Sequence, residues 1–309
     1  MNNTLPDDVR AFGATVRARL DALGGVQFAL RAETDESARS DAGAALAEVG
    51  AWDIDPRAGA DELLAAAQLC RMTGAVVLPY PVVEQLLSVG GARLALIDPQ
   101  RPWVDQGDLA GEWVGTDLDG RAHRLAPGQR RPSRLGPFAV RTAVQEPVAG
   151  VPADDVARHL LLGSWRLLGG LEAALELASA HVAVRKQFGK PLAEFQAVRF
   201  SAADAAVALR GLEELAKYTA WRIGTPGVDV GLVDAVALRL HAADVAREVL
   251  HCSHQLFGAI GFCDEHDVSV LDRHLQPLVR LPVTSDELAV RLEPAVADGS
   301  FESLFGRPA

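Results

Sequence analysis

Residues 185–196 read RKQFGKPLAEFQ, and this stretch decides how the rest of the chain is interpreted. It ends one long apolar helical pattern and begins another, with a turn at Gly189 and Pro191 between them. Backbone groups at helix ends are not all bonded within the helix. The stretch therefore predicts a cationic and aromatic cluster at a corner between two helices, formed by Arg185, Lys186, Gln187, Phe188 and Gln196.

Composition and charge exclude several classes of protein. The 309 residues suffice for a large core and two or three domains, and 49% hydrophobic with 23% charged residues is ordinary for a globular chain. The net charge of −11 argues against broad non-specific binding to nucleic acid or to anionic membranes. It still allows a local basic pocket that takes a phosphorylated ligand.

The sequence shows no targeting, membrane or metal signal. The N-terminal residues MNNTLPDDVR lack the pattern of a secretory leader, and no apolar run reaches the ~18 residues of a membrane span. We therefore expect a cytoplasmic protein. Three cysteines are too few for a disulfide framework, and Cys252 and Cys263 are expected to be buried thiols. No histidine pair has ligand spacing and a third partner, so we expect no metal site.

Three parts of the chain differ in pattern. Residues 1–90 predict an N-terminal helical domain, because apolar residues such as Val16 and Leu20 recur at helical spacing. Residues 91–150 carry short runs rich in β-branched and aromatic residues between Gly, Pro and Asp, which predicts a small β domain. Residues 151–309 predict long helices. The predicted fold is mainly α, with a C-terminal four-helix-type bundle.

Two motifs in the predicted bundle resemble those of the acyl-CoA dehydrogenase family. RKQFGKPLAEFQ is similar to the family's first FAD-contacting motif, and residues 254–262, HQLFGAIGF, are similar to the second. In the second motif Gln255 and Gly258 match the family pattern, whereas Ala259 stands where glycine is more usual. The motifs fall on successive helices in the family's order. The resemblance implies the acyl-CoA dehydrogenase fold, here with a reduced β domain.

The resemblance also implies a FAD site that two subunits share. In the family this corner binds the adenine and pyrophosphate end of a FAD in the neighbouring subunit's active site. Arg185 would supply charge to the pyrophosphate through its fixed fork of donors. Phe188 would border the adenosine part, and the glutamines would form hydrogen bonds. The residues implied to contact FAD are Arg185, Gln187, Phe188, Gln196, Gln255 and Gly258.

The family's catalytic base has no counterpart in this chain. Family members remove a substrate α-proton with a glutamate while the β-hydrogen leaves as hydride to the flavin. By register, Pro282 stands at that position, and proline cannot accept a proton through its side chain. Relatives that place the glutamate on the earlier long helix have it at the position of His159 or Arg158, and neither is a carboxylate. This histidine is either an alternative base or a structural residue between core and solvent, and Asp154 and Asp155 lie about one turn too early.

The β region also lacks the family's flavin-holding stretches. Family members hold the isoalloxazine ring with a Thr-Glu-x-x-x-Gly-Ser-Asp-like and a Trp-Ile-Thr-like stretch. The nearest phrase here is EWVGTDLDG, whose Trp113 and Thr116 are poor counterparts. The sequence therefore predicts that this chain keeps the residues that contact the FAD of a neighbouring subunit. It lacks the residues that would hold a flavin in its own active site.

Three hypotheses for function remain open. The first, favoured by intact motifs beside a missing base, is a non-catalytic subunit of a heteromeric acyl-CoA dehydrogenase, an oxidoreductase. A homologous full-length subunit would bind acyl-CoA and share the FAD, as in α2β2 members that act on CoA thioesters of steroid side chains, and an electron-transferring flavoprotein is the family's usual acceptor. The second is a self-sufficient homo-oligomeric dehydrogenase with a displaced base. The third is a flavin-free scaffold protein of the same fold.

Overall fold

The computed structural model describes residues 4–130, 133–225 and 231–297. Its N-terminal part is helical and consists of α1 (Asp7–Leu23), α2 (Val26–Ala32), α3 (Ser37–Glu48), a 3-10 turn η1 (Ala51–Asp53), α4 (Ala60–Ala75) and α5 (Val82–Leu86). The inner face of α1 buries Val16 and Leu20, as their spacing predicts. Pro79 and Pro81 lie between α4 and α5, where proline's missing N–H stops a helix from continuing.

Short strands form two small sheets between the helical parts. One sheet has the order β1-β3-β4-β6, with β1 and β3 parallel and the other pairs antiparallel. Its strands are β1 (Arg93–Leu96), β3 (Trp113–Thr116), β4 (Ala122–Ala126) and β6 (Ala143–Pro147). An antiparallel ribbon pairs β2 (Trp103–Asp105) with β5 (Ala139–Arg141). A small core of Ala95, Ile97, Val104, Trp113 and Leu125 joins both sheets, so the predicted small β region is confirmed.

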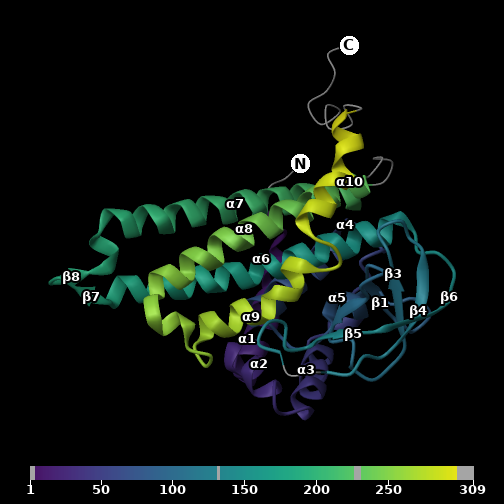
Figure 1. Ribbon diagram of the computed structural model, residues 1–309, viewed down its shortest axis with the longest axis horizontal. Helices are drawn as coiled ribbons and strands as arrows, with labels where there is room; N and C mark the ends of the chain where they lie inside the picture. The colour runs from purple at the N-terminus through teal and green to yellow at the C-terminus, as the bar shows by residue number, and fades with distance from the viewer. Residues whose placement is uncertain (1–3, 131–132, 226–230, 298–309) are drawn as a thin grey trace.

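The C-terminal part is a bundle of long helices. α6 (Ala153–Val184), α7 (Gln196–Gly224) and α8 (Leu232–Phe257) run alongside one another, followed by α9 (Asp267–Arg280) and α10 (Ser285–Ala297) (Figure 1). α6 packs against α8 and also against α4, so the N-terminal helices and the bundle share one core. Of the helices in the described ranges, α6 alone has the length and apolar composition of a membrane span. Many apolar residues of α6 lie in the core of this bundle. The long helices confirm the predicted mainly α fold.

α4 and α6 cross at unusually close range. A β-carbon added to Gly74 would lie 1.8 Å from the backbone oxygen of Arg166, and one added to Gly169 would lie 1.9 Å from that of Arg71. Neither position has room for a side chain, because backbone atoms cannot rotate away. This reciprocal contact fixes α6 against the N-terminal helices.

One sequence expectation about cysteine is wrong. Cys252 is buried on α8 as predicted, but Cys263 is exposed. Cys263 follows the 3-10 segment η3 (Gly258–Phe262) in the connection to α9, and its apolar sequence neighbours do not pack over it. Phe262 beside it is itself 70% exposed.

The middle of α9 is tied to the N-terminal helices by a hydrogen-bonded clamp. Arg273 and His274 each contact Oε1 of Glu33, at the end of α2, at 2.9 Å. His274 stands where the family has an aspartate after its arginine. In this chain the pair serves to dock α9, and burial lowers the pKa of His274 despite the neighbouring carboxylate.

Candidate functional site

The predicted corner is a tight hairpin at one end of the bundle. α6 ends at Val184, and β7 (Lys186–Gln187) pairs with β8 (Lys190–Pro191) before the 3-10 turn η2 (Leu192–Glu194) leads into α7. Figure 1 shows this hairpin at the end of α6 and α7 that lies farthest from the β region. The turn places Phe188 at φ 52° and Gly189 at φ 83°, the left-handed pair that a two-residue hairpin requires.

Phe188 is both strained and exposed. The left-handed backbone is unfavourable for a bulky residue and costs roughly 1 kcal/mol or more. Its side chain is nevertheless 90% exposed, with only an edge contact to Phe195 at a centroid distance of 6.2 Å. Val184 and Phe200 nearby are also exposed. Neither the strain nor the exposure of Phe188 helps the isolated chain to fold.

A cavity of about 700 Å³ lies beside the hairpin and collects most of the predicted residues. Arg185, Gln187, Gln255 and Gly258 all line it, although they come from two distant segments of the chain. Phe188 and Gln196 are not among its lining residues. Gln196 is exposed at the first residue of α7, next to the lining residue Ala197. The cofactor role of all six residues stays a prediction, and the structure brings four of them together.

Gly258 leaves the backbone accessible from this cavity. It follows the last residue of α8 at φ 65°, a conformation that L side chains rarely adopt. A β-carbon added there would meet no atom within 4 Å. The positive φ is the physical reason for glycine at this position, and the open space beside it would let a ligand approach the main chain.

The cavity is locally positive in a chain of net charge −11. Arg185 is exposed and lines it, and no residue within the described ranges pairs with its guanidinium. The lining contains no aspartate or glutamate. Two of the chain's three lysines, Lys186 and Lys190, lie on the adjoining hairpin, and the Lys190 ammonium sits 4.4 Å from the ring centroid of Phe195. This arrangement suits an anionic ligand with a planar ring.

The predicted position of the missing base offers little space. Pro282 and His159 line one internal cavity together with Glu84, Asp105 and Arg239, and its volume is only about 50 Å³. That space holds a few water molecules, whereas ligand pockets usually need ~300 Å³ or more. The place where a substrate would meet a base therefore cannot admit an acyl thioester in this conformation.

Arg239 helps to keep this cavity small. It is 4% exposed, and its Nη2 donates to the backbone oxygens of Leu278 and Leu281 at the end of α9, the latter at 2.8 Å. No carboxylate among the described residues pairs with it. Burial lowers its pKa to about 10. The guanidinium thus anchors the segment that carries Pro282 to α8.

Glu84 is a carboxylate in this cavity that sequence reasoning missed. Its Oε1 lies 3.8 Å from Nε2 of His159, too far for a hydrogen bond, and both side chains are nearly buried. Burial raises the pKa of Glu84 to about 7 against the opposing charge of Arg166, and burial lowers the pKa of His159 to about 4. His159 is therefore neutral, and its side chain, 12% exposed, lies between core and solvent as one of the two interpretations of the sequence had it. Only the tertiary fold, not any local pattern, brings Glu84 to Pro282.

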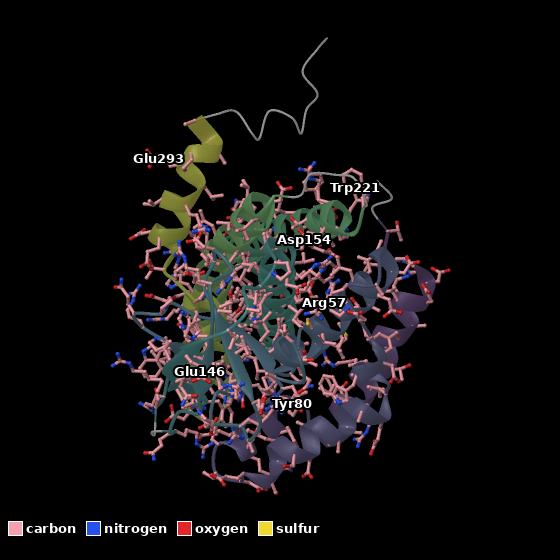
Figure 2. The ribbon with its side chains drawn as sticks, turned by 90° about the vertical axis from the view of Figure 1, so that its right-hand side faces the viewer. Arg57, Tyr80, Glu146, Asp154, Trp221 and Glu293 are labelled. Carbon is pink, nitrogen blue, oxygen red and sulfur yellow. The ribbon has the colours of Figure 1, made fainter. Side chains whose placement is uncertain are left out.

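The two early aspartates of α6 do not serve as bases either. Asp155 is buried and accepts hydrogen bonds from Arg57 at 3.1 Å and from Arg158 at 3.2 Å. Asp154 is exposed, and Figure 2 shows it on the same side of the molecule as Arg57. Asp155 thus anchors the start of α6 to Arg57.

The Glu84→Gln variant is expected to be more stable than the wild type at about pH 8, by on the order of 3 kcal/mol. The folded-state pKa of about 7 exceeds the ordinary value of 4.5, so burying the ionised carboxylate opposes folding. Wild-type stability should therefore fall as the pH rises from 4.5 through about 7, and the variant should lack this fall. Urea unfolding at both ends of that range measures it, with the exposed Glu112→Gln as control. A variant with the wild-type pH dependence would contradict the assignment.

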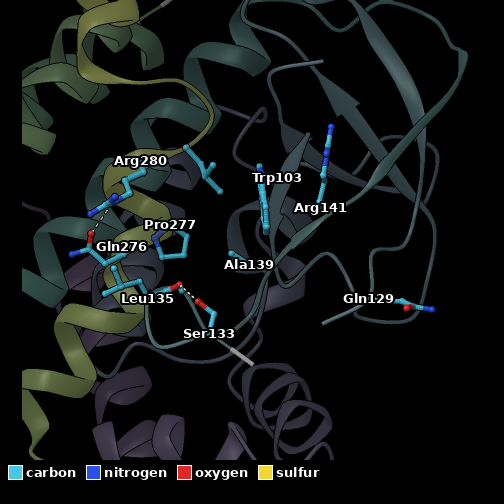
Figure 3. Close-up of a pocket in the computed structure, with 11 residues that line it drawn as sticks. Trp103, Gln129, Ser133, Leu135, Ala139, Arg141, Gln276, Pro277 and Arg280 are labelled. Atoms are coloured by element: carbon cyan, nitrogen blue, oxygen red, sulfur yellow. Dashed lines mark hydrogen bonds between the residues drawn. The ribbon is translucent and has the colours of Figure 1, made fainter. Parts of the chain in front are cut away.

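A second, open cleft lies between the β region and α9. Its volume is about 620 Å³, and Figure 3 shows Trp103 and Arg141 of the β2–β5 ribbon on one side with Gln276, Pro277 and Arg280 of α9 on the other. Neither arginine pairs with a carboxylate within the described ranges, and no acidic residue lines the cleft. It shares Trp103, Pro277 and Leu281 with the small cavity at Pro282. No local sequence pattern indicates this cleft, because three separate segments of the chain form it.

Comparison with known proteins identifies the bundle. Residues 160–278 match the family model "Acyl-CoA dehydrogenase, C-terminal domain". The mitochondrial isobutyryl-CoA dehydrogenase of Dictyostelium discoideum is 36% identical over 111 residues, which cover 36% of this chain and 26% of that protein. The chain thus spans about a quarter of the length of the curated relatives that it matches.

Solved structures share the fold over nearly the whole chain. The ChsE4-ChsE5 complex from Mycobacterium tuberculosis has a TM-score of 0.78 at 15% identity and covers 100% of both chains. A variant of the Tcur3481-Tcur3483 steroid ACAD has a TM-score of 0.74 at 20% identity and covers 96% of this chain and 99% of that chain. A glutaryl-CoA dehydrogenase from Mycobacterium smegmatis in complex with FADH2 has a TM-score of 0.71 at 16% identity and covers 94% and 95%.

The fold and the matched domain define the class of protein. Residues 160–278 match the C-terminal domain of the acyl-CoA dehydrogenase family, and the chain shares the fold of solved acyl-CoA dehydrogenase structures throughout the described ranges. Within the family, the structures of like fold include a complex of two named chains and a steroid dehydrogenase.

Proposed function

We propose that this chain is a non-catalytic subunit of a heteromeric, FAD-dependent acyl-CoA dehydrogenase and that it completes the FAD site of a homologous full-length subunit. The observation that carries the proposal is a contrast within one chain. The corner beside Arg185 is a positive cavity of about 700 Å³, whereas the cavity at the predicted base position, Pro282, has a volume of only about 50 Å³. One half of a shared site has room for a ligand and the other half does not.

The corner fits the adenine and pyrophosphate end of FAD. Its volume lies within the ~300–1,000 Å³ usual for cofactor sites. Arg185 would pair with the pyrophosphate, Gln187 and Gln255 would form hydrogen bonds with it or with the adenosine part, and the open backbone at Gly258 would allow close approach. Phe188 and Gln196 would contact the ligand at the mouth. The bound flavin supplies the hydride acceptor of the reaction.

The partner subunit would supply everything that this chain lacks. It would carry the glutamate base, a full β domain and the acyl-CoA, and it would cover the exposed tip at Phe188 and Val184. The heteromeric and steroid relatives of like fold support a CoA thioester of a steroid side chain as the substrate class. An electron-transferring flavoprotein would reoxidise the flavin.

Flavin counting after co-expression tests the proposal. The chain should be produced alone and together with a homologous full-length dehydrogenase from the same organism. We expect one FAD per heterodimer in the complex and none in the chain alone, with α,β-dehydrogenation of an acyl-CoA only by the complex. A yellow, active homo-oligomer would contradict the proposal, and a stable complex without flavin would favour the scaffold hypothesis instead.

A self-sufficient dehydrogenase is the second candidate, and one observation favours it. The open cleft of about 620 Å³ borders the small cavity at Pro282, so a small movement of Leu281 and Pro277 would join the two. Glu84, whose pKa of about 7 suits a general base, would then face the joined space. This candidate requires that the chain bind flavin without a partner and that Glu84→Gln abolish turnover of that homo-oligomer.

A further inference from the structure

We propose that His181 is a second cation of the cofactor corner, which takes up a proton when a diphosphate binds and then donates a hydrogen bond to it. The inference rests on the proposed function, because it assigns a residue and a pH dependence to the same FAD-binding corner. Neither sequence motif contains His181, which lies before the first of them.

His181 is placed beside Arg185 by the helix and held there by a ring contact. It lies four residues before Arg185, the C-cap residue of α6, whose backbone N–H donates to the carbonyl oxygen of His181 at 2.9 Å, so the two residues lie one turn apart. Both line the cavity of about 700 Å³. The imidazole packs on Phe257 with a centroid distance of 4.6 Å, and Phe257 in turn meets the ring of His266 edge-on at 4.4 Å. No residue of the described ranges forms a hydrogen bond with the His181 ring, so its nitrogens are available to a ligand.

Only positive groups act on His181 in the absence of a ligand. Arg185 faces it from its own helix, and His266 faces it from the start of α9. The other lining residues, which come from η2, α7, the end of α8 and η3, have no ionisable side chain: Leu192, Ala197, Val198, Ser201, Gln255, Leu256, Gly258, Ala259 and Ile260. Partial burial lowers the pKa of His181, and the charges of Arg185 and His266 lower it further. The ring is therefore neutral near pH 7 while the corner is empty.

A bound diphosphate reverses the sign of the local field. Its negative charge beside His181 favours the imidazolium, so binding raises the pKa of that residue and draws in a proton. The diphosphate of FAD is a diester with no proton to lose in the neutral range, so the proton must come from solvent to the protein. Affinity should then fall as the pH rises through the interval between the free and the bound pKa of His181. Arg185, always charged, cannot produce such a dependence.

The test measures FAD binding to the assembled complex after its flavin has been removed. Between about pH 6 and pH 8, the FAD affinity of the wild type should fall by a larger factor than that of the His181→Gln variant. We expect the ratio of the two factors to be about ten. Calorimetry in buffers of different ionisation enthalpy should show uptake of a fraction of a proton per FAD bound by the wild type and less by the variant. His251→Gln, an exposed histidine of α8 outside this cavity, is the matched control and should retain the wild-type slope.

The outcomes separate this inference from the proposed function. If Arg185→Gln weakens FAD binding while His181→Gln keeps the wild-type slope and proton uptake, the role of His181 is wrong and the shared site stands. If FAD binds with the same affinity to the wild type and to Arg185→Gln, the corner is idle and both proposals fail. Circular dichroism melting of each variant shows whether a loss reflects unfolding. The His181→Lys variant, with a fixed charge, should bind FAD with little dependence on pH in this range.

Discussion

The Arg185→Ala variant of the assembled complex is expected to bind FAD about a hundredfold more weakly than the wild type, because a charge-assisted pair of this kind contributes ~1.5–3 kcal/mol. The guanidinium lines the corner cavity and has no partner within the described ranges, so the free chain does not depend on it for folding. Its removal should therefore change the flavin content and leave the fold intact.

Gel filtration followed by the ratio of flavin to protein absorbance measures this loss. The matched control is Arg199→Ala, an exposed arginine in the first turn of α7 that does not line the cavity. Full flavin occupancy in the Arg185 variant under dilute conditions would show that the corner does not bind the cofactor. Equal losses in both variants would point to general electrostatic attraction rather than to a specific contact.

The Gly169→Ala variant is expected to lose about 3 kcal/mol or more of its free energy of unfolding. This is the largest loss of stability that we expect from adding a single methyl group to this chain. Its β-carbon would lie 1.9 Å from the backbone oxygen of Arg71, so α4 and α6 would have to separate. Side chains cannot relieve this overlap by changing rotamer, since the obstructing atom belongs to the main chain. Because α6 carries the corner at its far end, a shift of this helix should also reduce flavin occupancy.

Gly163→Ala is the matched control on the same helix. A β-carbon at Gly163 would meet no atom within 4 Å, so the change should raise stability by ~0.5–1 kcal/mol through helix propensity. Urea unfolding of the complex at one fixed subunit concentration compares the two variants, since the stability of an assembly depends on concentration. Similar stabilities for the two variants would show that the crossing is looser than described.

The corner could be predicted from the sequence because its information is local. RKQFGKPLAEFQ combines the end of α6, a turn and the start of α7 within 12 residues. HQLFGAIGF lies at the end of α8. Helical spacing then suffices to bring Arg185 and Gln255 to the same end of a bundle. The mainly α fold and the small β region follow from equally local patterns.

The small cavity at Pro282 could not be predicted, because its walls come from distant segments. Glu84 lies on α5, His159 on α6 and Arg239 on α8, and none of them belongs to a motif. The sequence shows that Pro282 cannot act as a base, but not that the surrounding space is filled. The parallel pairing of β1 with β3 and the exposure of Cys263 likewise depend on tertiary contacts between segments that are distant in the sequence.

The scarcity of lysine gives the hairpin a practical use as a reporter. Lys217 is 8% exposed and its ammonium is engaged by Glu214 at 2.8 Å, which leaves Lys186 and Lys190 as the accessible lysine amines. An amine-reactive label or a short lysine-directed cross-linker applied to the native protein would thus modify its side chains almost only at the corner. Peptide mass fingerprinting of that one segment could then follow assembly and cofactor loading in a crude extract, without any engineered tag.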